Sequence, residues 1–313
     1  MVSYVLKRIG SAVAIVFLVS IITFFVMNAI PGSPFLDENQ SFEQVELANK
    51  KYGLDKPLIV QYKNYMCNLL KGDMGVSLKM QKDTPVKTLI FNQGKFGLTI
   101  RIGVISLIVI VVVGVVLGCV MAYTRGSLLD SALGVVCTMG IAIPTFVVAT
   151  IMLTVFSMKL GWLPPLSGNL STVKSYVMPV IALSMSNTCT LIKLTRTSML
   201  DAINQDYIRT AKAKGLKTKV IIFKHALRNS LIPVVTYLGP LTAGLLTGGF
   251  VTETTFGIPG IAKYFVDSII NRDYPIIMGT TIILSAMVIF INLIVDLIYM
   301  VVDPRITLTK KGA

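Results

Sequence analysis

The sequence predicts an all-α integral membrane protein with six transmembrane helices. Only 14% of the residues are charged, whereas a soluble domain averages about 25%. The apolar residues gather into runs without Asp, Glu, Lys or Arg, each long enough for the roughly 17–25 residues that cross a bilayer. A β-barrel is excluded because its strands would be about ten residues long and would alternate in polarity. The six runs are 9–30, 102–123, 131–158, 175–192, 229–252 and 274–295.

The distribution of basic residues predicts the orientation. The net charge is +14, but its placement fits a membrane protein and gives no support for nucleic-acid binding. The positive-inside rule counts Lys and Arg in short loops, so the long segment 31–97 is left out. The rule places both termini in the cytoplasm. The basic residues on that side are Lys7, Arg8, Lys193, Arg196, Arg209, Lys212, Lys214, Lys217, Lys219, Lys224, Arg228, Arg305, Lys310 and Lys311.

The first run predicts a retained transmembrane helix, 1–30, because its 22 uncharged residues exceed the roughly 7–15 of a removable signal peptide. Segment 31–97 follows as an external subdomain with short helices. Ser41 and Gln44 match a capping box, Gly53 matches a helix end, and Pro57 matches a second start. A lid on the membrane core and a contact surface for a partner protein are both compatible with this pattern. The second helix carries an apolar stripe of Leu58, Tyr62, Tyr65, Met66 and Leu69.

The membrane core is expected over 98–313. Pro144 lacks an amide donor and must kink or break the third run. The fourth run is the most polar, so it must face other helices or a wet path. Small residues crowd the fifth run over 239–249, which suits either close packing or a cavity. In the sixth run Asn292 and Asp296 share one face, and Asp296 is the only intramembrane acid that the runs leave as a functional candidate.

A basic connection over about 195–230 predicts a pair of short cytoplasmic helices. Asp206 suits the N-cap of the first helix, and Gly215 suits its C-terminal stop. Thr218 is expected to cap a second helix that reaches Ala226. Charge alone would allow this surface to bind anionic lipid headgroups.

The residue pattern of this connection favours another interpretation. The stretch 206–216, Asp-Tyr-Ile-Arg-Thr-Ala-Lys-Ala-Lys-Gly-Leu, and the stretch 224–233, Lys-His-Ala-Leu-Arg-Asn-Ser-Leu-Ile-Pro, resemble the coupling loop of ABC importer permeases. The similarity is greatest to the dipeptide, oligopeptide and nickel permease family, in which this loop docks into a groove on the ATPase. Ala211 and Gly215 keep the general spacing, while Arg209 and Thr210 depart from it. The resemblance implies ATPase-coupling roles for Asp206, Tyr207, Arg209, Ala211, Ala213, Gly215 and Leu216.

Further motifs extend the resemblance over nearly the whole chain. They are 29–34 (Ala-Ile-Pro-Gly-Ser-Pro), 52–55 with Pro57, 72–77 (Gly-Asp-Met-Gly-Val-Ser), 255–261, 272–275 (Arg-Asp-Tyr-Pro) and 303–305. They imply a B-type subunit with the type I ABC importer permease fold, in a bacterial or archaeal plasma membrane. The implied partners are a homologous second permease, two cytoplasmic ATPase subunits and an extracytoplasmic substrate-binding protein.

The resemblance implies a permease subunit that forms half of a path for di- or oligopeptides, with a nickel chelate as the alternative cargo. Neither a P-loop nor a G-x-S-x-G element is present, so we expect no enzyme and no cofactor on this chain, with ATP and Mg on the partner ATPases. His225 is expected to be a loop residue, and no metal site is predicted. An ion-driven carrier and a membrane-embedded enzyme are the rival classes. The hypothesised path residues are Asn187, Thr242, Gly244, Asn292 and Asp296.

Overall fold

A computed structural model describes residues 2–35, 42–164, 172–217 and 220–302, and for 2–7, 223–225 and 296–302 it describes the backbone alone. Helices account for all the regular elements within these residues, apart from a single bridge between Val76 and Pro85. The chain divides into two compact units. Unit 1 comprises 1–99 and 259–290, and unit 2 comprises 100–258 and 291–313.

Helices occupy all six of the predicted apolar runs. Five candidate spans are long and apolar enough to cross a bilayer, and a pair of helices bent by 98° gives a sixth when the pair is counted as one span. The bend falls where Ile143 ends one helix and Pro144 precedes the next, so the predicted break at Pro144 is confirmed. The five candidate spans other than the bent pair are Arg8–Ala29, Lys95–Tyr123, Val173–Ile203, Leu227–Thr255 and Tyr274–Val295.

Unit 1 packs short helices against a long one. The apolar stripe of α3 meets α1 through Tyr62, Tyr65 and Leu69, which pack against a cluster containing the buried Phe24 and Met27. Leu58, the first residue of α3, was expected in this stripe but is 40% exposed. The elements are α1 (Val2–Ala29), α2 (Phe42–Tyr52), α3 (Leu58–Leu70), the π-helical turn η1 (Thr88–Asn92), α12 (Ile261–Ile270) and the first parts of α4 (Lys95–Tyr123) and α13 (Tyr274–Val302).

The predicted helix boundaries in the 31–97 segment are confirmed where they are described. Gly53 follows the last residue of α2 with φ +69°, a conformation that glycine adopts without steric cost. Pro57 is the N-cap of α3. The predicted capping box includes Ser41, which lies outside the described residues.

A buried carboxylate joins two parts of unit 1 that lie 196 residues apart in sequence. Asp273 is fully buried, and its oxygens accept four hydrogen bonds. The donors are the hydroxyl of Ser77 at 2.6 Å and the backbone amides of Leu78 at 3.1 Å, Lys79 at 3.0 Å and Met80 at 3.0 Å. Two of the sequence motifs, 72–77 and 272–275, therefore contact each other. This contact accounts for Ser77 in the first motif and Asp273 in the second.

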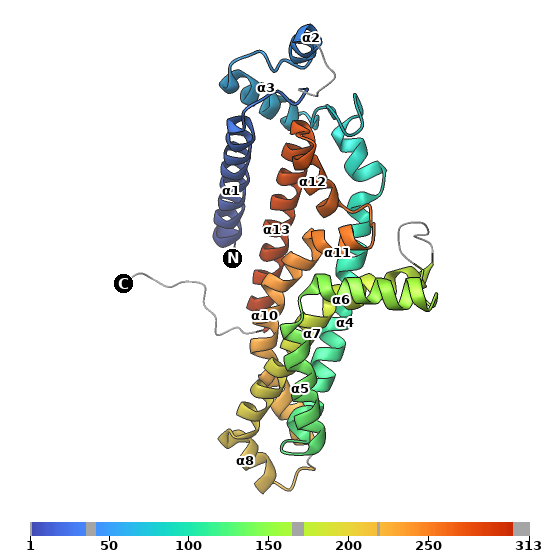
Figure 1. Ribbon diagram of the computed structural model, residues 1–313. Coiled ribbons are helices and arrows are strands. Elements are labelled where there is room, and N and C mark those ends of the chain that lie inside the picture. The colour runs from blue at the N-terminus through green and yellow to red at the C-terminus, as the bar shows by residue number, and fades with distance from the viewer. Residues whose placement is uncertain (1, 36–41, 165–171, 218–219, 303–313) are drawn as a thin grey trace. The chain divides into compact units, whose positions relative to one another are not determined.

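Unit 2 is a bundle in which α4, α5, α7 and α10 run alongside one another, with α8 at one end (Figure 1). Glycines let α4 approach α7 closely, because a β-carbon on Gly114 or Gly118 would lie 2.7 Å from Leu191 or 2.5 Å from Thr195. These glycines form a G-x-x-x-G pattern, a signal that our sequence analysis did not use. The elements are α5 (Leu128–Ala142), α6 (Thr145–Met152), η2 (Leu153–Lys159), α7 (Val173–Ile203), α8 (Asp206–Ala213), η3 (Ile221–Ala226), α10 (Leu227–Thr247) and α11 (Phe250–Thr255).

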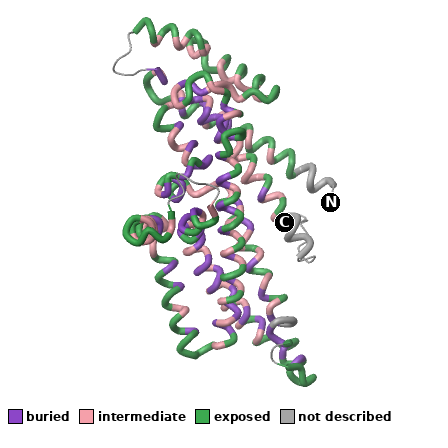
Figure 2. The backbone as a smooth tube through the Cα atoms, turned by 90° about the vertical axis from the view of Figure 1, so that its right-hand side faces the viewer, coloured by how far each residue is buried: buried purple, intermediate pink, exposed green. Residues whose placement is uncertain are grey.

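The polar side chains of α7 face other parts of unit 2, as the sequence predicted. Ser184 and Thr188 are buried, and Ser186, Asn187 and Thr190 are half-buried. Figure 2 shows buried, half-buried and exposed residues alternating along the long helices of this unit. A helix surrounded by lipid alone would leave these hydroxyl and amide groups in hydrocarbon.

The expectation that Asp296 is the only intramembrane acid was wrong. Asp130 lies in α5 and Glu253 lies in α11, each within a candidate span. Their exposed fractions are 6% and 3%. The sequence analysis missed them because charge-free runs end at the first charged residue, whereas the helices continue past it.

Candidate functional site

The short helix α8 is anchored by two apolar side chains. Ile208 is fully buried and Ala211 is 6% exposed. They share one face of the helix, three residues apart. Both belong to a buried cluster with residues of α4, α7 and η3, among them Met199 and Ile222. Ile208 is a residue that our sequence analysis missed, although its spacing from Ala211 on a helix of polar residues is a signal for a buried face.

The opposite face of α8 is exposed. Tyr207 and Leu216 are each 39% exposed although both carry large side chains. Of the seven residues to which the resemblance gives an ATPase-coupling role, Ala211 is buried and the other six are exposed. The exposed residues of this surface, which we call the α8 face, are Asp206, Tyr207, Arg209, Thr210, Lys212, Ala213, Lys214, Gly215 and Leu216.

Backbone hydrogen bonds end α8 at Gly215, as predicted. The amide of Gly215 donates to the carbonyl of Lys212 at 2.9 Å, and the amide of Leu216 donates to the carbonyl of Ala211 at 3.3 Å. This pair of bonds is a Schellman motif, which requires a left-handed residue after the helix. Gly215 meets this requirement with φ +73°.

The start of α8 and the segment after it differ from the prediction. Gln205 is the N-cap and Asp206 is the first helical residue, so the assignment of Asp206 as the cap was wrong by one position. An acid in the first turn still interacts favourably with the helix dipole. The predicted cap Thr218 lies outside the described residues. His225 lies in the π-helical turn η3, which continues into α10, so the expected loop is helical there.

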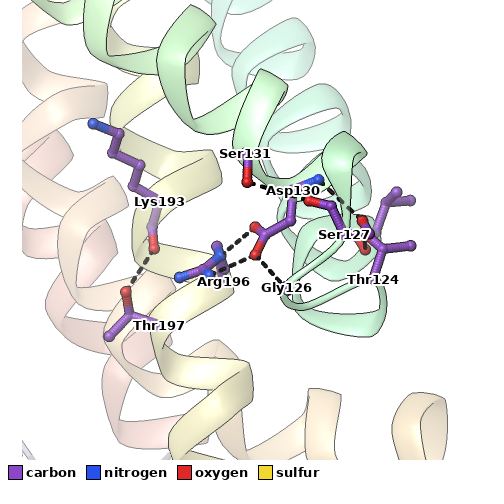
Figure 3. A network of polar contacts seen from close by, with 9 residues as sticks. Thr124, Gly126, Ser127, Asp130, Ser131, Lys193, Arg196 and Thr197 are labelled. Atoms are coloured by element: carbon purple, nitrogen blue, oxygen red, sulfur yellow. Dashed lines mark hydrogen bonds and ion pairs between the residues drawn. The ribbon is translucent and has the colours of Figure 1, made fainter.

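An ion pair connects the first turn of α5 to the half of α7 that leads to α8 (Figure 3). The guanidinium of Arg196 contacts both carboxylate oxygens of Asp130, at 2.7 Å and 2.8 Å. The amide of Gly126 donates to the same carboxylate at 3.1 Å, and the hydroxyl of Ser127 caps α5. Two parallel bonds from a planar guanidinium fix orientation as well as distance. Sequence reasoning missed this pair because its residues are 66 positions apart.

The structure brings one of the hypothesised path residues to a partner on another helix. The Asn187 side-chain oxygen on α7 accepts a hydrogen bond from the Tyr237 hydroxyl on α10 at 3.2 Å. Tyr237 was missed by the sequence analysis. It lies seven positions before Gly244, and residues two helical turns apart share a face. A β-carbon on Gly244 would meet no atom within 4 Å.

The other path residues are not joined by described contacts. The hydroxyl of Thr242 donates to its own helix, to the carbonyl of Leu238 at 2.6 Å. Asn292 is half-buried, and the side chain of Asp296 lies outside the described residues. Among the side chains that the structure describes, no group of three or more His, Cys, Asp or Glu residues is placed to hold a metal ion.

Comparisons with known proteins match the whole chain. Residues 114–308 match the family described as "Binding-protein-dependent transport system inner membrane component", and residues 1–96 match "Binding-prot-dependent transport system membrane comp, N-term". The "Dipeptide transport system permease protein DppB" of Bacillus subtilis is 42% identical over 313 residues, which cover 100% of both chains. The protein of the same name from Lactococcus lactis is 39% identical over 98% of this chain and 100% of its own. The "Oligopeptide transport system permease protein OppB" of Haemophilus influenzae is 38% identical over 98% of this chain and 99% of its own.

Proposed function

The chain belongs to the family of binding-protein-dependent transport system inner membrane components, as a B-type permease of the peptide ABC importers in the plasma membrane, and from this premise we propose its mechanism. The subunit forms half of a translocation path for di- or oligopeptides. A homologous second permease forms the other half. An extracytoplasmic binding protein delivers the peptide, and two cytoplasmic ATPases bind ATP and Mg.

The α8 face is the observation that carries the proposed coupling to an ATPase. The helix leaves large apolar groups such as Tyr207 and Leu216 exposed and is anchored from behind by Ile208 and Ala211. A ligand shifts a conformational equilibrium only if it contacts the two states differently. In the proposed mechanism the ATPase contacts Asp206, Tyr207, Arg209, Ala213, Gly215 and Leu216, while Ala211 holds the helix on the bundle.

The proposed orientation places both termini and α8 in the cytoplasm, where the exposed Lys212 and Lys214 obey the positive-inside rule. Segment 31–97 is then external, between the first helix, 1–30, and the core, 98–313. The contact between Asn187 and Tyr237 and the open side of Gly244 support a path along α7 and α10. Thr242, Asn292 and Asp296 complete the proposed path.

Uptake measurements test the cargo. Cells that lack only this chain should lose ATP-dependent uptake of labelled di- and tripeptides and regain it when the chain is expressed again. Labelled nickel is measured in parallel, with and without ATP depletion. Unchanged peptide uptake together with reduced nickel uptake would replace the proposed cargo with a nickel chelate. Peptide uptake that persists after ATP depletion would favour an ion-driven carrier.

A bulky residue at position 215 tests the coupling. A β-carbon on Gly215 meets no atom of the described residues within 4 Å, so we expect Gly215→Trp to act through backbone strain and through contact with a partner. Gly94→Trp is the matched control, because Gly94 has the same φ of +73° and the same open surroundings. We expect Gly215→Trp to abolish peptide uptake while ATP hydrolysis persists, and Gly94→Trp to leave uptake nearly unchanged. Normal uptake by Gly215→Trp would refute the coupling role.

A further inference from the structure

Sulfur-containing side chains gather where α4, α5 and α7 of unit 2 meet. The thiols of Cys137 on α5 and Cys189 on α7 interact with each other, and neither thiol is in a disulfide. Met121 on α4 belongs to the same buried cluster. Its methyl group lies 3.9 Å from the position of a β-carbon on Gly134, which precedes Cys137 by three residues and shares its face of α5. Two thiols and one thioether therefore lie on one side of α5.

A second thioether lies beside the Cys189 thiol. A β-carbon on Gly140 would lie 2.5 Å from the Cys189 sulfur and 3.6 Å from the terminal methyl carbon of Met185. Gly140 follows Cys137 by three residues, so it lies on the same face of α5. Any larger residue at position 140 would displace the Cys189 sulfur from α5. We call the following four side chains the sulfur cluster: Met121, Cys137, Met185 and Cys189.

Lys193 supplies a positive charge beside the sulfur cluster. It follows Cys189 by one helical turn, and its ammonium group donates a hydrogen bond at 2.8 Å to the hydroxyl of Thr138, the residue after the α5 thiol. Figure 3 shows the Lys193 side chain directed away from Asp130, whose carboxylate pairs with Arg196. Among the described residues Lys193 has no ion-pair partner. An unpaired cation in a membrane span is costly, so an anionic group beside it would be stabilised.

We propose that the sulfur cluster binds a soft monovalent metal ion, Cu(I), between the sulfurs of Cys137 and Cys189. Thiolates and thioethers are soft ligands that suit Cu(I). Both thiols release their protons to water when the ion binds, so two thiolates and one Cu(I) carry one net negative charge. Lys193 balances this charge within the membrane. The thioethers of Met121 and Met185 complete the ligand set.

The ligand set and its surroundings favour this ion over the alternatives. A structural Zn(II) site usually has four Cys or His ligands, whereas the sulfur cluster has two Cys and no His. Apolar packing can explain buried Cys and Met side chains, but packing requires neither two thiols in contact nor a neighbouring lysine. Cys189 is 8% exposed, and Met185 and Lys193 are half-buried, so the ion reaches the thiols from this side of α7. The sequence analysis predicted no metal site because the ligands come from three separate helices.

Binding of Ag(I) tests the site, because Ag(I) shares the charge and soft character of Cu(I) and stays in one oxidation state. The full chain is purified in nanodiscs as Cys67→Ser, which removes the exposed thiol, and Ag(I) is titrated against a competing chelator. We expect one tightly bound equivalent. Cys137→Ser and Cys189→Ser should each weaken binding more than the roughly 10–100-fold that loss of a group supporting a ligand costs. Cys119→Ser is the matched control, because Cys119 is also buried but belongs to another cluster, and it should bind like the starting protein.

Lys193→Gln tests the charge balance. Two thiolates and one Hg(II) are neutral together, so Hg(II) does not need the lysine. We expect Lys193→Gln to weaken Ag(I) binding about 10–100-fold, as for other groups that support metal ligands without touching the ion, and to leave Hg(II) binding nearly unchanged.

Three outcomes would overturn the inference. The first is no tight Ag(I) equivalent in the starting protein. The second is equal Ag(I) binding by Cys137→Ser, Cys189→Ser and Cys119→Ser. The third is a Lys193→Gln variant that binds Ag(I) as tightly as the starting protein, which would reject the monovalent ion. Thermal unfolding without metal shows whether each variant is folded, and Cys137→Ala or Cys189→Ala replaces a serine variant that is not.

Discussion

Two segments that lie outside the long helices are fixed by opposite kinds of contact. Residues 77–80 in unit 1 are held by four hydrogen bonds to the buried Asp273. In unit 2, α8 is held by the apolar side chains of Ile208 and Ala211. Hydrogen bonds to a charged group are directional and fix one geometry, whereas apolar burial is non-directional. The comparison indicates that segment 77–80 is built for one conformation, while α8 can rotate slightly without losing a polar bond.

Removing the carboxylate of Asp273 should have the largest effect. Asp273→Ala leaves the Ser77 hydroxyl and three backbone amides without their acceptor, at about 1–3 kcal/mol for each buried group. We expect destabilisation by more than about 3 kcal/mol and little folded protein in the membrane. Size-exclusion profiles and thermal unfolding of the purified chain measure this effect. Asp73→Ala is the control, because Asp73 is exposed and its carboxylate accepts one described hydrogen bond, from the amide of Gly75. Equal behaviour of the two variants would contradict the importance of the Asp273 contact.

Truncating the apolar anchor of α8 should come second. Ile208→Ala removes a fully buried side chain, a change that typically costs about 2–5 kcal/mol. Because the loss is confined to one short helix, we expect the chain to remain folded while α8 detaches. Amide hydrogen exchange over 206–216 should accelerate, and peptide uptake per ATP hydrolysed should fall.

A graded substitution sharpens this test of α8. Ile208→Val keeps most of the buried side chain and should cost only about 0.5–1.5 kcal/mol, with a correspondingly smaller rise in exchange. If Ile208→Ala left the exchange of 206–216 unchanged, other contacts would have to hold α8, and the contrast with Asp273 would fail.

Breaking the ion pair between Asp130 and Arg196 should have an intermediate effect. The Arg196 side chain is 29% exposed, so water can compensate it in part, and we expect about 1–3 kcal/mol for Asp130→Ala, in line with the loss of a hydrogen-bonded charge. The pair holds the first turn of α5 to α7 just before α8, so the ratio of uptake to ATP hydrolysis should fall as well. A double-mutant cycle with Arg196→Ala separates the pairwise energy from other effects. Additive losses would show that the two side chains do not act together.

The sequence predicted the spans and helix ends more fully than the contacts between distant residues. Pro144 and Gly215 act through their own backbone, so their effects are visible locally. Asp273 acts on residues almost 200 positions away, and no local pattern shows that its carboxylate is buried. For Asp130 the charge itself misled the analysis, because a paired acid is tolerated inside a helix that a charge-free run would end. The Ile208 anchor was accessible from its spacing, but the family motif drew attention to the exposed residues instead.

The smallest predicted effect is that of a methyl group at Gly215. The methyl group of Gly215→Ala meets no atom of the described residues within 4 Å, so we expect its cost to be the strain of a left-handed alanine, about 1–2 kcal/mol. Gly215→Asn should cost less, because asparagine tolerates this conformation better. Gly97→Ala is the matched control, since Gly97 lies within α4 in equally open surroundings without a positive φ, and alanine there should stabilise by about 0.5–1 kcal/mol. Hydrogen exchange at the end of α8 should therefore rise for Gly215→Ala and less for Gly215→Asn. An equal rise for both variants would show that the end of α8 depends on more than the left-handed turn at Gly215. It would also show that contacts besides those of Ile208 and Ala211 hold the helix in place.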